Sequence, residues 1–229
     1  KEHPTLVVVV GDVNSTIACS LTAKKMHIKV IHVEAGLRSF DMDMPEEINR
    51  VLVDRISDLL FVTEKSGLEN LLNEGQKNTK IYFVGNVMID SVKHYLPKTE
   101  VSEILQKYSL EEKKYVLVTL HRPSNVDGKE QLQKLFNLLN NIAEKRKVIF
   151  PIHPRTKKHL VEFGMIDFLT LTKNTELILT DSGGIQEEAT YLGIQCITLR
   201  TTTERPITVE IGTNQLLGSN LELAEKTAF

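Results

Sequence analysis

The sequence has no tryptophan, only two cysteines, and no apolar run near the about 20 residues that a bilayer crossing requires. It also lacks an excess of charge of either sign, because 28 Lys and Arg residues stand against 30 Asp and Glu, for a formal net charge of -2. Such a balance gives no general attraction to nucleic acid or to an anionic membrane. We therefore expect neither as a partner, and any anionic ligand has to be bound locally.

The cysteines and the start of the chain bear on the cellular compartment. Cys19 and Cys196 lie inside apolar runs far apart in the sequence, without the spacing of a metal site. This pattern predicts two buried free thiols in a reducing cytoplasm rather than a disulfide. The first residues, Lys1-Glu-His-Pro4, do not form the charged and then apolar segment of a secretory signal.

What the sequence does contain is a regular alternation of β-branched runs and helical stretches. The apolar runs are continuous, which indicates strands covered on both faces, and their alternation with helices implies parallel sheets of the α/β class. We expect strands at residues 6–10, 29–33, 59–62, 81–84, 115–119, 148–151, 177–180 and 196–199, and helices at residues 15–26, 46–56, 64–73, 129–145 and 185–192.

The alternation lapses in three places, and each suggests a feature of the organisation. A polar helical stretch between Met88 and Lys114 predicts two Rossmann-like domains, residues 1–95 and residues 96–229, with a cleft between them. The chain begins at once on a central-looking strand, so we expect the first domain to lack its N-terminal part. The helical stretches expected at residues 156–163 and 167–173 meet at Gly164 without an intervening strand, and we therefore expect residues to be absent around Met165.

A glycine-rich turn follows one of the buried strands and opens a helix. Gly183 and Gly184 allow a ligand to approach the backbone closely, the amides at the helix start favour a phosphate, and Ser182 adds a hydroxyl donor. Glu188, about one turn further on, can reach a ribose diol. The alternative is an ordinary helix N-cap formed by Asp181 or Ser182.

Basic and hydroxyl-bearing residues follow neighbouring strands, so they are expected at the same sheet edge. Arg200-Thr-Thr-Thr-Glu-Arg205 offers guanidinium groups and hydroxyls that suit a diphosphate, although a solvated loop remains an alternative. His121 and Arg122 follow the first strand of the second domain, a position suited to phosphate binding or proton transfer. His153 and Arg155 give a similar but weaker indication.

Acidic residues lie at the corresponding ends of the first domain's strands. Asp12 follows the first strand and Glu34 the second, and Glu46 and Glu47 both lie at the start of the next helix. We expect one of these two glutamates to converge with Asp12 and Glu34 on one cleft. Carboxylates that face a sugar suit general acid/base catalysis, because crowding and burial separate their pKa values. The alternative is that Asp12 caps a helix and that Glu46 and Glu47 only favour its dipole.

Together these motifs resemble the UDP-N-acetylglucosamine 2-epimerase family of bacteria and archaea. The motifs that carry the resemblance are Gly11-Asp12, His32-Val-Glu-Ala-Gly-Leu-Arg38, Pro45-Glu-Glu-Ile-Asn-Arg50, Gly85-Asn86, His121-Arg122, Asp181-Ser-Gly-Gly-Ile-Gln-Glu-Glu188 and Thr203-Glu-Arg-Pro206. The resemblance implies a GT-B-like α/β fold with the active site between two Rossmann-like domains. It also implies an isomerase that is cytoplasmic and homodimeric and that needs no cofactor, neither a metal nor a nicotinamide.

The same resemblance implies a reaction and a set of site residues. UDP-GlcNAc and UDP-ManNAc would be interconverted through elimination of UDP to 2-acetamidoglucal, followed by re-addition. It assigns catalysis to Asp12, Glu34, Glu46 and His121, and contacts with UDP to Arg122, Ser182, Gly183, Gly184, Glu188 and Arg205. Epimerases of diacetamido-uronic UDP-sugars share most of these motifs, and GT-B glycosyltransferases share the UDP contacts, so both remain alternatives.

One departure from the family pattern concerns regulation. His121-Arg-Pro-Ser-Asn125 differs from the His-Arg-Arg-Glu form of some bacterial members. Because those members include the ones that UDP-GlcNAc activates allosterically, we do not expect such activation here.

Overall fold

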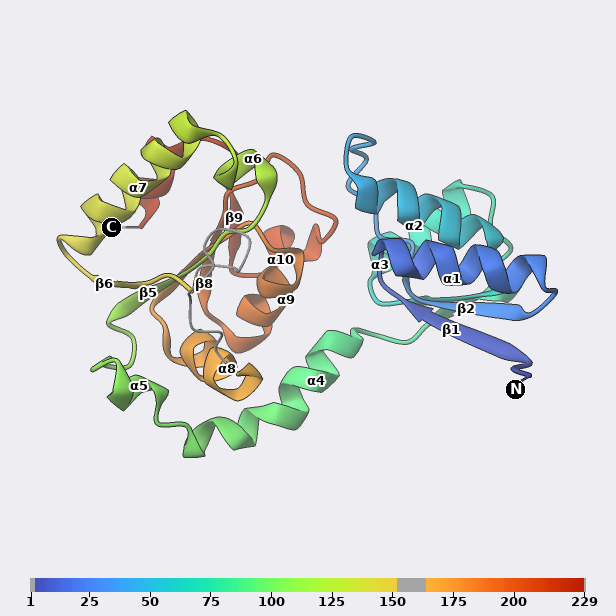
Figure 1. Ribbon diagram of the computed structural model, residues 1–229, viewed down its shortest axis with the longest axis horizontal. Helices are drawn as coiled ribbons and strands as arrows, with labels where there is room; N and C mark the ends of the chain where they lie inside the picture. Colours follow the sequence, from blue (N-terminus) through green and yellow to red (C-terminus); the bar gives the residue numbers. More distant parts are fainter. Residues whose placement is uncertain (1–2, 152–163, 229) are drawn as a thin grey trace. The chain divides into compact units, whose positions relative to one another are not determined.

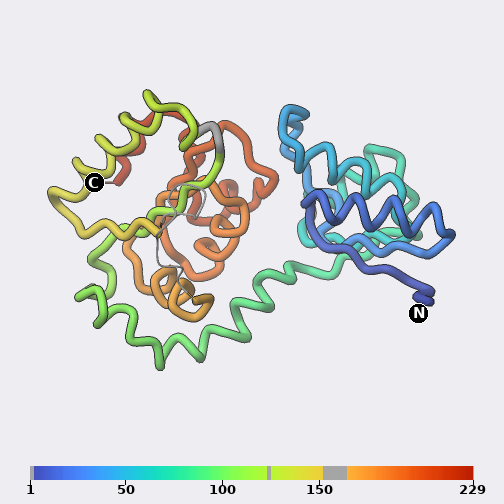
Figure 2. Tube along the Cα trace, in the orientation of Figure 1, coloured from blue at the N-terminus to red at the C-terminus, as the bar shows by residue number. Residues whose placement is uncertain are grey.

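The computed structural model describes residues 3–151 and 164–228, which form two compact α/β units (Figure 1). The first unit comprises Lys1–Val87 together with Glu204–Pro206, and the second comprises Met88–Thr203 and Ile207–Phe229. Helix α4, Val87–Tyr95, begins at the point where the chain passes from the first unit to the second (Figure 2). The division expected at residue 95 stays a prediction about the domains.

The first unit is a parallel four-stranded sheet in the order β1-β2-β3-β4, with helices packed on one face. Its buried core joins Val9 and Val30 of the strands to Ala23 and Val53 of the first two helices, which run side by side. The elements are β1 Leu6–Val10, α1 Asn14–Lys25, β2 Lys29–Ala35, α2 Pro45–Ile56, β3 Leu59–Val62, α3 Lys65–Asn73, the short 3-10 helix η1 Asn78–Lys80 and β4 Ile81–Phe83.

The expectation that the first strand is covered on both faces is wrong for the described residues. Leu6, Val8 and Val10 are 40%, 56% and 55% exposed, whereas Val9 is buried. Successive side chains of a strand point to opposite faces, and α1, α2 and α3 pack on the face of Val9. An apolar run shows that both faces are apolar, but it does not show that both are covered.

The second unit is a parallel five-stranded sheet in the order β6-β5-β7-β8-β9. Helices cover both faces: α7 and α11 pack on one cluster of buried residues, and α5, α8 and α9 on another. The elements are η2 Leu96–Val101, α5 Ile104–Lys107, β5 Tyr115–Thr119, α6 Pro123–Val126, α7 Lys129–Ala143, β6 Lys147–Ile149, α8 Met165–Asn174, β7 Leu177–Thr180, α9 Gly183–Leu192, β8 Gln195–Thr198, α10 Ile207–Glu210, β9 Asn214–Leu216 and α11 Leu221–Thr227.

The parallel α/β class is confirmed, and the predicted strands occur with ends shifted by a residue or two. Strand β9 and helices α10 and α11 were not predicted, because their short, mixed sequences carry little periodicity. The helix expected at residues 156–163 lies outside the described residues, as do His153 and Arg155.

Both cysteines are free thiols, but only Cys196 is buried as expected. The inward stripe of α1 consists of Thr16, Ser20 and Ala23, and Cys19 lies outside that stripe, exposed to solvent. Within the described ranges, none of the helices combines the length and the apolar character needed to span a bilayer.

Candidate active site

In the first unit, Glu34 occupies an unusual backbone conformation at the carboxyl end of β2. The pairing register between β2 and β3 shifts between Val33 and Ala35, so Glu34 forms a bulge, and its φ is 74°. The left-handed region costs a residue with a Cβ about 1–2 kcal/mol, and such strain recurs at functional sites. The bulge brings the carboxylate over the turn after β1, where a Cβ on Gly11 would lie 3.3 Å from its Oε2.

Asp12, directly after that turn, is held by consecutive residues of α2. The guanidinium of Arg50 donates to Asp12 Oδ2 from Nε at 2.9 Å and from Nη2 at 2.7 Å. The amide of Asn49 donates to the Asp12 main-chain carbonyl at 2.8 Å. The alternative that Asp12 caps a helix is not met, since the N-cap residue of α1 is Val13. Asp12 is instead part of a charge cluster and remains 27% exposed.

Arg205 joins Glu34 to the same cluster. It donates from Nη2 to Glu34 Oε1 in a very short ion pair and from Nη1 to Glu204 Oε1 at 2.8 Å. Glu204 Oε1 also lies 3.7 Å from Arg50 Nη2. Opposite charges therefore alternate along Asp12, Arg50, Glu204, Arg205 and Glu34, and we call this set the acid–arginine chain. The structure thus brings Arg205 into contact with Glu34, one of the predicted catalytic acids.

The two glutamates that open α2 have different surroundings. Glu47 is buried and accepts hydrogen bonds from the main-chain N–H groups of Ser39 and Phe40 at 2.9 and 3.0 Å, and from Arg50 Nη1 at 2.6 Å. It therefore fixes the loop after β2. Glu46 is half-buried and, among the described residues, makes neither a hydrogen bond nor an ion pair, so it is not brought into contact with Asp12 or Glu34. Of the two, Glu46 is the carboxylate that is not committed to holding the fold.

In the second unit, the glycine turn leads into α9 without a side-chain cap. The N-cap residue is Ser182, and its side chain makes no capping hydrogen bond in the part of the chain that the structure describes. Its own N–H donates to Thr180 Oγ1 at 3.0 Å. The first amides of a helix have no intrahelical partner, so those of Gly183 and Gly184 suit an anion. The alternative of an ordinary capped helix start is therefore not what is found.

Asp181 organises the loop that carries His121 and Arg122. Its buried carboxylate accepts from the main-chain N–H of each, at 3.1 and 3.0 Å, from His121 Nδ1 at 3.0 Å, and from Asn125 Nδ2 at 3.0 Å. Burial would raise the pKa of Asp181, but the hydrogen bonds from the His121 and Asn125 side chains and the Arg122 N–H outweigh it and lower that pKa. A charged Asp181 thus places His121 and Arg122 beside the glycine turn. Sequence reasoning treated Asp181 only as a possible cap.

A buried amide network supports the other side of the turn. Gln186 of α9 accepts from Thr203 Oγ1 at 2.8 Å and from Asn214 Nδ2 at 3.0 Å, and its own amide donates to Ser182 O at 3.2 Å. Because all three partners use one fixed amide, the turn and the threonine-rich loop are held in one arrangement. Gln186 and Asn214 were not predicted as site residues, whereas the hydroxyl of Thr203 was expected to suit a diphosphate.

Glu188, the expected ribose contact, is an unusually weak acid. Desolvation by burial, together with the neighbouring carboxylate of Glu187, raises the pKa of Glu188 to about 7. The pKa of Glu188 in the folded protein lies above its value of 4.5 in the unfolded chain, so below that value the carboxyl is protonated in both states and stability is fully retained. As pH rises further, the unfolded chain ionises first and the protein loses stability, and this loss is complete above about pH 7.

The Glu188→Gln variant should therefore be more stable than the wild type above pH 7. A shift of one pKa unit corresponds to about 1.4 kcal/mol, and we expect a gain in unfolding free energy of about 1–3 kcal/mol at pH 8 and little change at pH 4.5. Urea denaturation at the two pH values measures it. The exposed Glu100→Gln serves as the control, and an equal effect of both substitutions, or one independent of pH, would contradict the assignment.

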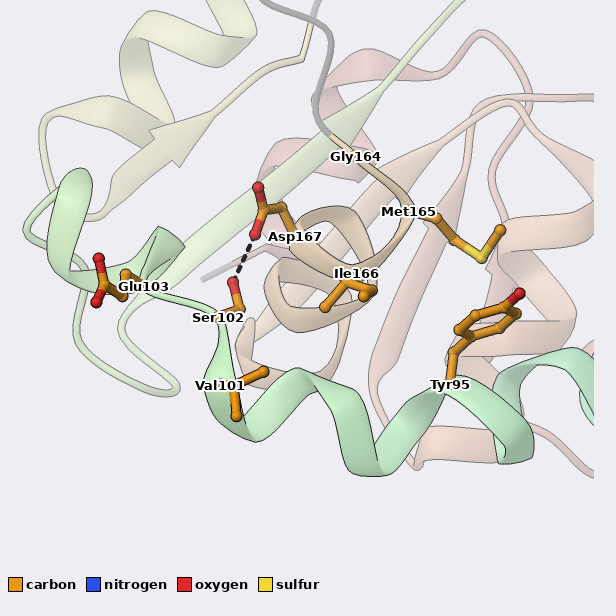
Figure 3. Close-up of a pocket in the computed structure, with 8 residues that line it drawn as sticks. All are labelled: Tyr95, Val101, Ser102, Glu103, Gly164, Met165, Ile166 and Asp167. Carbon is orange, nitrogen blue, oxygen red and sulfur yellow. Dashed lines mark hydrogen bonds between the residues drawn. The ribbon is translucent and has the colours of Figure 1, made fainter.

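A cavity of about 630 Å³ lies near the start of α8. It is lined by the end of η2, by the two residues before α5 and by the start of α8, with Tyr95 and Met165 on one side (Figure 3). Ser102 and Asp167 point toward each other and form a hydrogen bond of 2.6 Å. None of the predicted site residues lines this cavity. No group of three or more His, Cys, Asp or Glu side chains in the described ranges is placed to hold a metal ion.

Comparisons with known proteins agree with this arrangement. The family model described as UDP-N-acetylglucosamine 2-epimerase matches residues 1–227. A UDP-N-acetylglucosamine 2-epimerase of Methanocaldococcus jannaschii is 48% identical, with 97% of this chain and 67% of the relative covered. A UDP-2,3-diacetamido-2,3-dideoxy-D-glucuronate 2-epimerase of Pseudomonas aeruginosa is 38% identical, with 100% and 68% covered. The chain thus spans about two thirds of the length of these relatives.

Solved structures give the same result for the fold. The crystal structure of the M. jannaschii enzyme in complex with UDP-GlcNAc and UDP matches with a TM-score of 0.90 at 47% identity, covering 97% of this chain and 67% of that one. This likeness confirms the GT-B-like α/β class. The alignment with the M. jannaschii relative runs over 245 positions, more than the 229 residues of this chain, so the chain lacks some positions within it. That they lie around Met165 stays a prediction.

Proposed function

This chain belongs to the UDP-N-acetylglucosamine 2-epimerase family, and from that premise we propose that it interconverts UDP-GlcNAc and UDP-ManNAc. The observation that carries the proposal is the acid–arginine chain, which holds Asp12 and Glu34 at the carboxyl ends of neighbouring parallel strands. Two carboxylates fixed in this way suit removal of a proton from a sugar carbon and its return on the other face.

The proposed reaction is an elimination followed by an addition. A carboxylate removes the proton at C2, the bond between C1 and the diphosphate oxygen breaks, and UDP departs to leave 2-acetamidoglucal. UDP then adds back at C1 while a proton is delivered to C2 from the opposite face. We assign this acid/base work to Asp12, Glu34 and Glu46, without deciding which of them takes the C2 proton.

The departing diphosphate needs positive charge and hydrogen-bond donors. We propose that the uncapped amides of Gly183 and Gly184, with Ser182, His121 and Arg122, bind it. Asp181 supports this proposal because it holds the last two beside the turn.

Two residues complete the proposed UDP contacts. Glu188 would accept hydrogen bonds from the ribose hydroxyls. Arg205 stays a proposed UDP contact, and its ion pair with Glu34 gives it a further role, which is to orient that carboxylate.

Two other activities share much of this machinery. An epimerase of a UDP-diacetamido-uronic sugar is favoured by the 38% identity to the P. aeruginosa enzyme. A GT-B glycosyltransferase would share the UDP contacts but would need an acceptor site. A non-catalytic UDP-sugar-binding module would have no need of the acid–arginine chain, which therefore supports an enzyme.

The wider setting is also a proposal. We infer that the enzyme acts in the cytoplasm as a homodimer, without metal or nicotinamide, and supplies an activated sugar to polysaccharide biosynthesis. The family membership supports these statements, and none of them is needed for the chemistry above.

The proposed reaction predicts that solvent hydrogen enters the sugar at C2. Incubation of the whole protein with UDP-GlcNAc in D2O, followed by proton NMR, should show deuterium at C2 and both UDP-sugars at equilibrium. An unchanged C2 signal would reject the reaction for this sugar, and exchange in a UDP-diacetamido-uronic sugar alone would favour the first alternative. Free ManNAc with UDP would identify a hydrolysing epimerase.

A further inference from the structure

His32 is a fully buried histidine directly beneath the turn that carries Asp12. It lies on β2, two residues before Glu34, and has no exposed surface. Its Nδ1 is 2.6 Å from Asp54 Oδ1 on α2, and its Nε2 is 3.0 Å from the main-chain oxygen of Gly11. The ring thus connects the helix that bears Arg50 to the turn before Asp12.

The hydrogen-bond partners of the His32 ring indicate which nitrogen donates to the turn. The Gly11 oxygen can only accept a hydrogen bond, so Nε2 carries a proton. Asp54 accepts at Oδ2 from the Gly36 N–H at 3.0 Å and forms an ion pair with Arg38 Nη2 at 2.8 Å, as expected of an ionised carboxylate. The ring is thus held on both sides, by Asp54 at Nδ1 and by the Gly11 carbonyl at Nε2.

Arg38 holds Asp54, the carboxylate that partners the ring, in place. Arg38 is buried and also pairs with Glu74, which follows α3, through Nε at 2.7 Å. Burial would lower the pKa of Arg38, but its bonds to Glu74 and Asp54 outweigh this and raise that pKa. Arg38 thus connects Asp54, the partner of the His32 ring, to Glu74.

We propose that His32 is a positioning residue that fixes Asp12 by holding the carbonyl of Gly11. Gly11 has a φ of 67°, and its N–H donates to Val33 O at 3.1 Å. With its carbonyl held by His32, both ends of this glycine are hydrogen-bonded to β2. The peptide unit is planar, so a fixed Gly11 carbonyl also fixes the direction in which Asp12 leaves the turn.

A purely structural role would have a different origin. If His32 only neutralised Asp54, the bond at Nδ1 would matter and the bond at Nε2 would not. If it positions Asp12, the bond at Nε2 carries the effect. The side-chain amide of Asn can replace the donor at Nδ1, and the longer amide of Gln can replace the donor at Nε2, so two substitutions separate the two roles.

The test compares His32→Gln with His32→Asn in the whole protein, and it rests on the proposed epimerase reaction. Misplacement of a catalytic group by an ångström costs about 100-fold in rate, so we expect kcat for C2 exchange to fall about 100-fold in His32→Asn and clearly less in His32→Gln. KM and the affinity for UDP should stay within about threefold of the wild type in both, as expected when only transition-state interactions are lost. His27→Asn, at an exposed position of the same unit, is the matched control and should not change kcat.

The reverse ranking of the two variants, or an equal loss of kcat and UDP affinity, would overturn the proposal. NMR of the wild type with 15N-labelled histidine gives a second measurement that does not depend on the variants folding. Nε2 of His32 should carry a proton, and a ring that carries its proton on Nδ1 alone would also overturn the proposal. Absence of C2 exchange in the wild type would instead reject the proposed reaction, while the labelled ring still reports its protonation.

Discussion

Replacement of Glu34 by Gln should abolish C2 proton exchange while leaving UDP affinity within a few-fold of the wild type. Gln has nearly the shape of Glu but cannot accept a proton as a base, and loss of a general base costs about 10²- to 10⁴-fold in rate. The affinity should persist because the proposed diphosphate contacts, the amides of Gly183 and Gly184 with Ser182, are unchanged in this variant. Exchange in D2O followed by NMR measures the rate, and calorimetric titration with UDP measures the affinity.

The control for this substitution is Glu69→Gln on the exposed surface of α3, where the glutamate side chain is 60% exposed. It removes the same charge from the same unit and should change neither quantity. An equal loss of exchange and of UDP affinity in Glu34→Gln would contradict the catalytic role, because it would mean that Glu34 acts through the UDP site. Retention of exchange would assign the base to Asp12 or Glu46.

The parts of the fold that the sequence allowed us to predict are those determined by local pattern. Continuous β-branched runs identified the strands, and the paired glycines after β7 identified an uncapped helix start. Both depend on residues within about ten positions of one another, which is the range of periodicity and turn chemistry. Asp12, Glu34 and His121 lie at the carboxyl ends of their strands, and they were chosen as candidates because ligands of α/β folds bind beyond those ends.

What could not be predicted depends on contacts between distant positions. Arg205 and Glu34 are 171 positions apart, and Asp181 lies about 60 positions from the loop that it holds. Sequence reasoning could not separate Glu46 from Glu47, because neighbouring residues on a helix differ only in the direction of their side chains. The burial of Glu47 and the contact of the His32 ring with the Gly11 carbonyl both depend on how β1, β2 and α2 pack together, which the sequence does not show.

The bulge at Glu34 belongs to the same class. Its left-handed backbone gives no signal in the sequence, because the residue is not a glycine. The glycine that follows two positions later, Gly36, does give a signal, yet its reason lies 31 positions away, in the backbone of Gly67. The motif around Glu34 therefore combines a proposed catalytic residue with a glycine that packing requires.

The packing requirement can be tested on its own with Gly36→Ala, which should lower the free energy of unfolding by about 2–5 kcal/mol. The φ of Gly36 is 83°, which costs an alanine about 1–2 kcal/mol, and an overpacked contact adds about 1–3 kcal/mol. The added Cβ would lie 2.3 Å from the main-chain oxygen of Gly67, an atom of α3 that cannot move without its helix. Urea denaturation measures the change.

Gly75→Ala separates the two causes, because Gly75 has a φ of 78° and the described chain offers a new Cβ no atom within 4 Å. It should cost only the backbone term, about 1–2 kcal/mol. The difference between the variants then measures the contact between β2 and α3, which places Glu34 relative to the rest of the unit. Equal destabilisation by both would mean that α3 yields to the extra methyl group and that Gly36 is required for its backbone conformation alone.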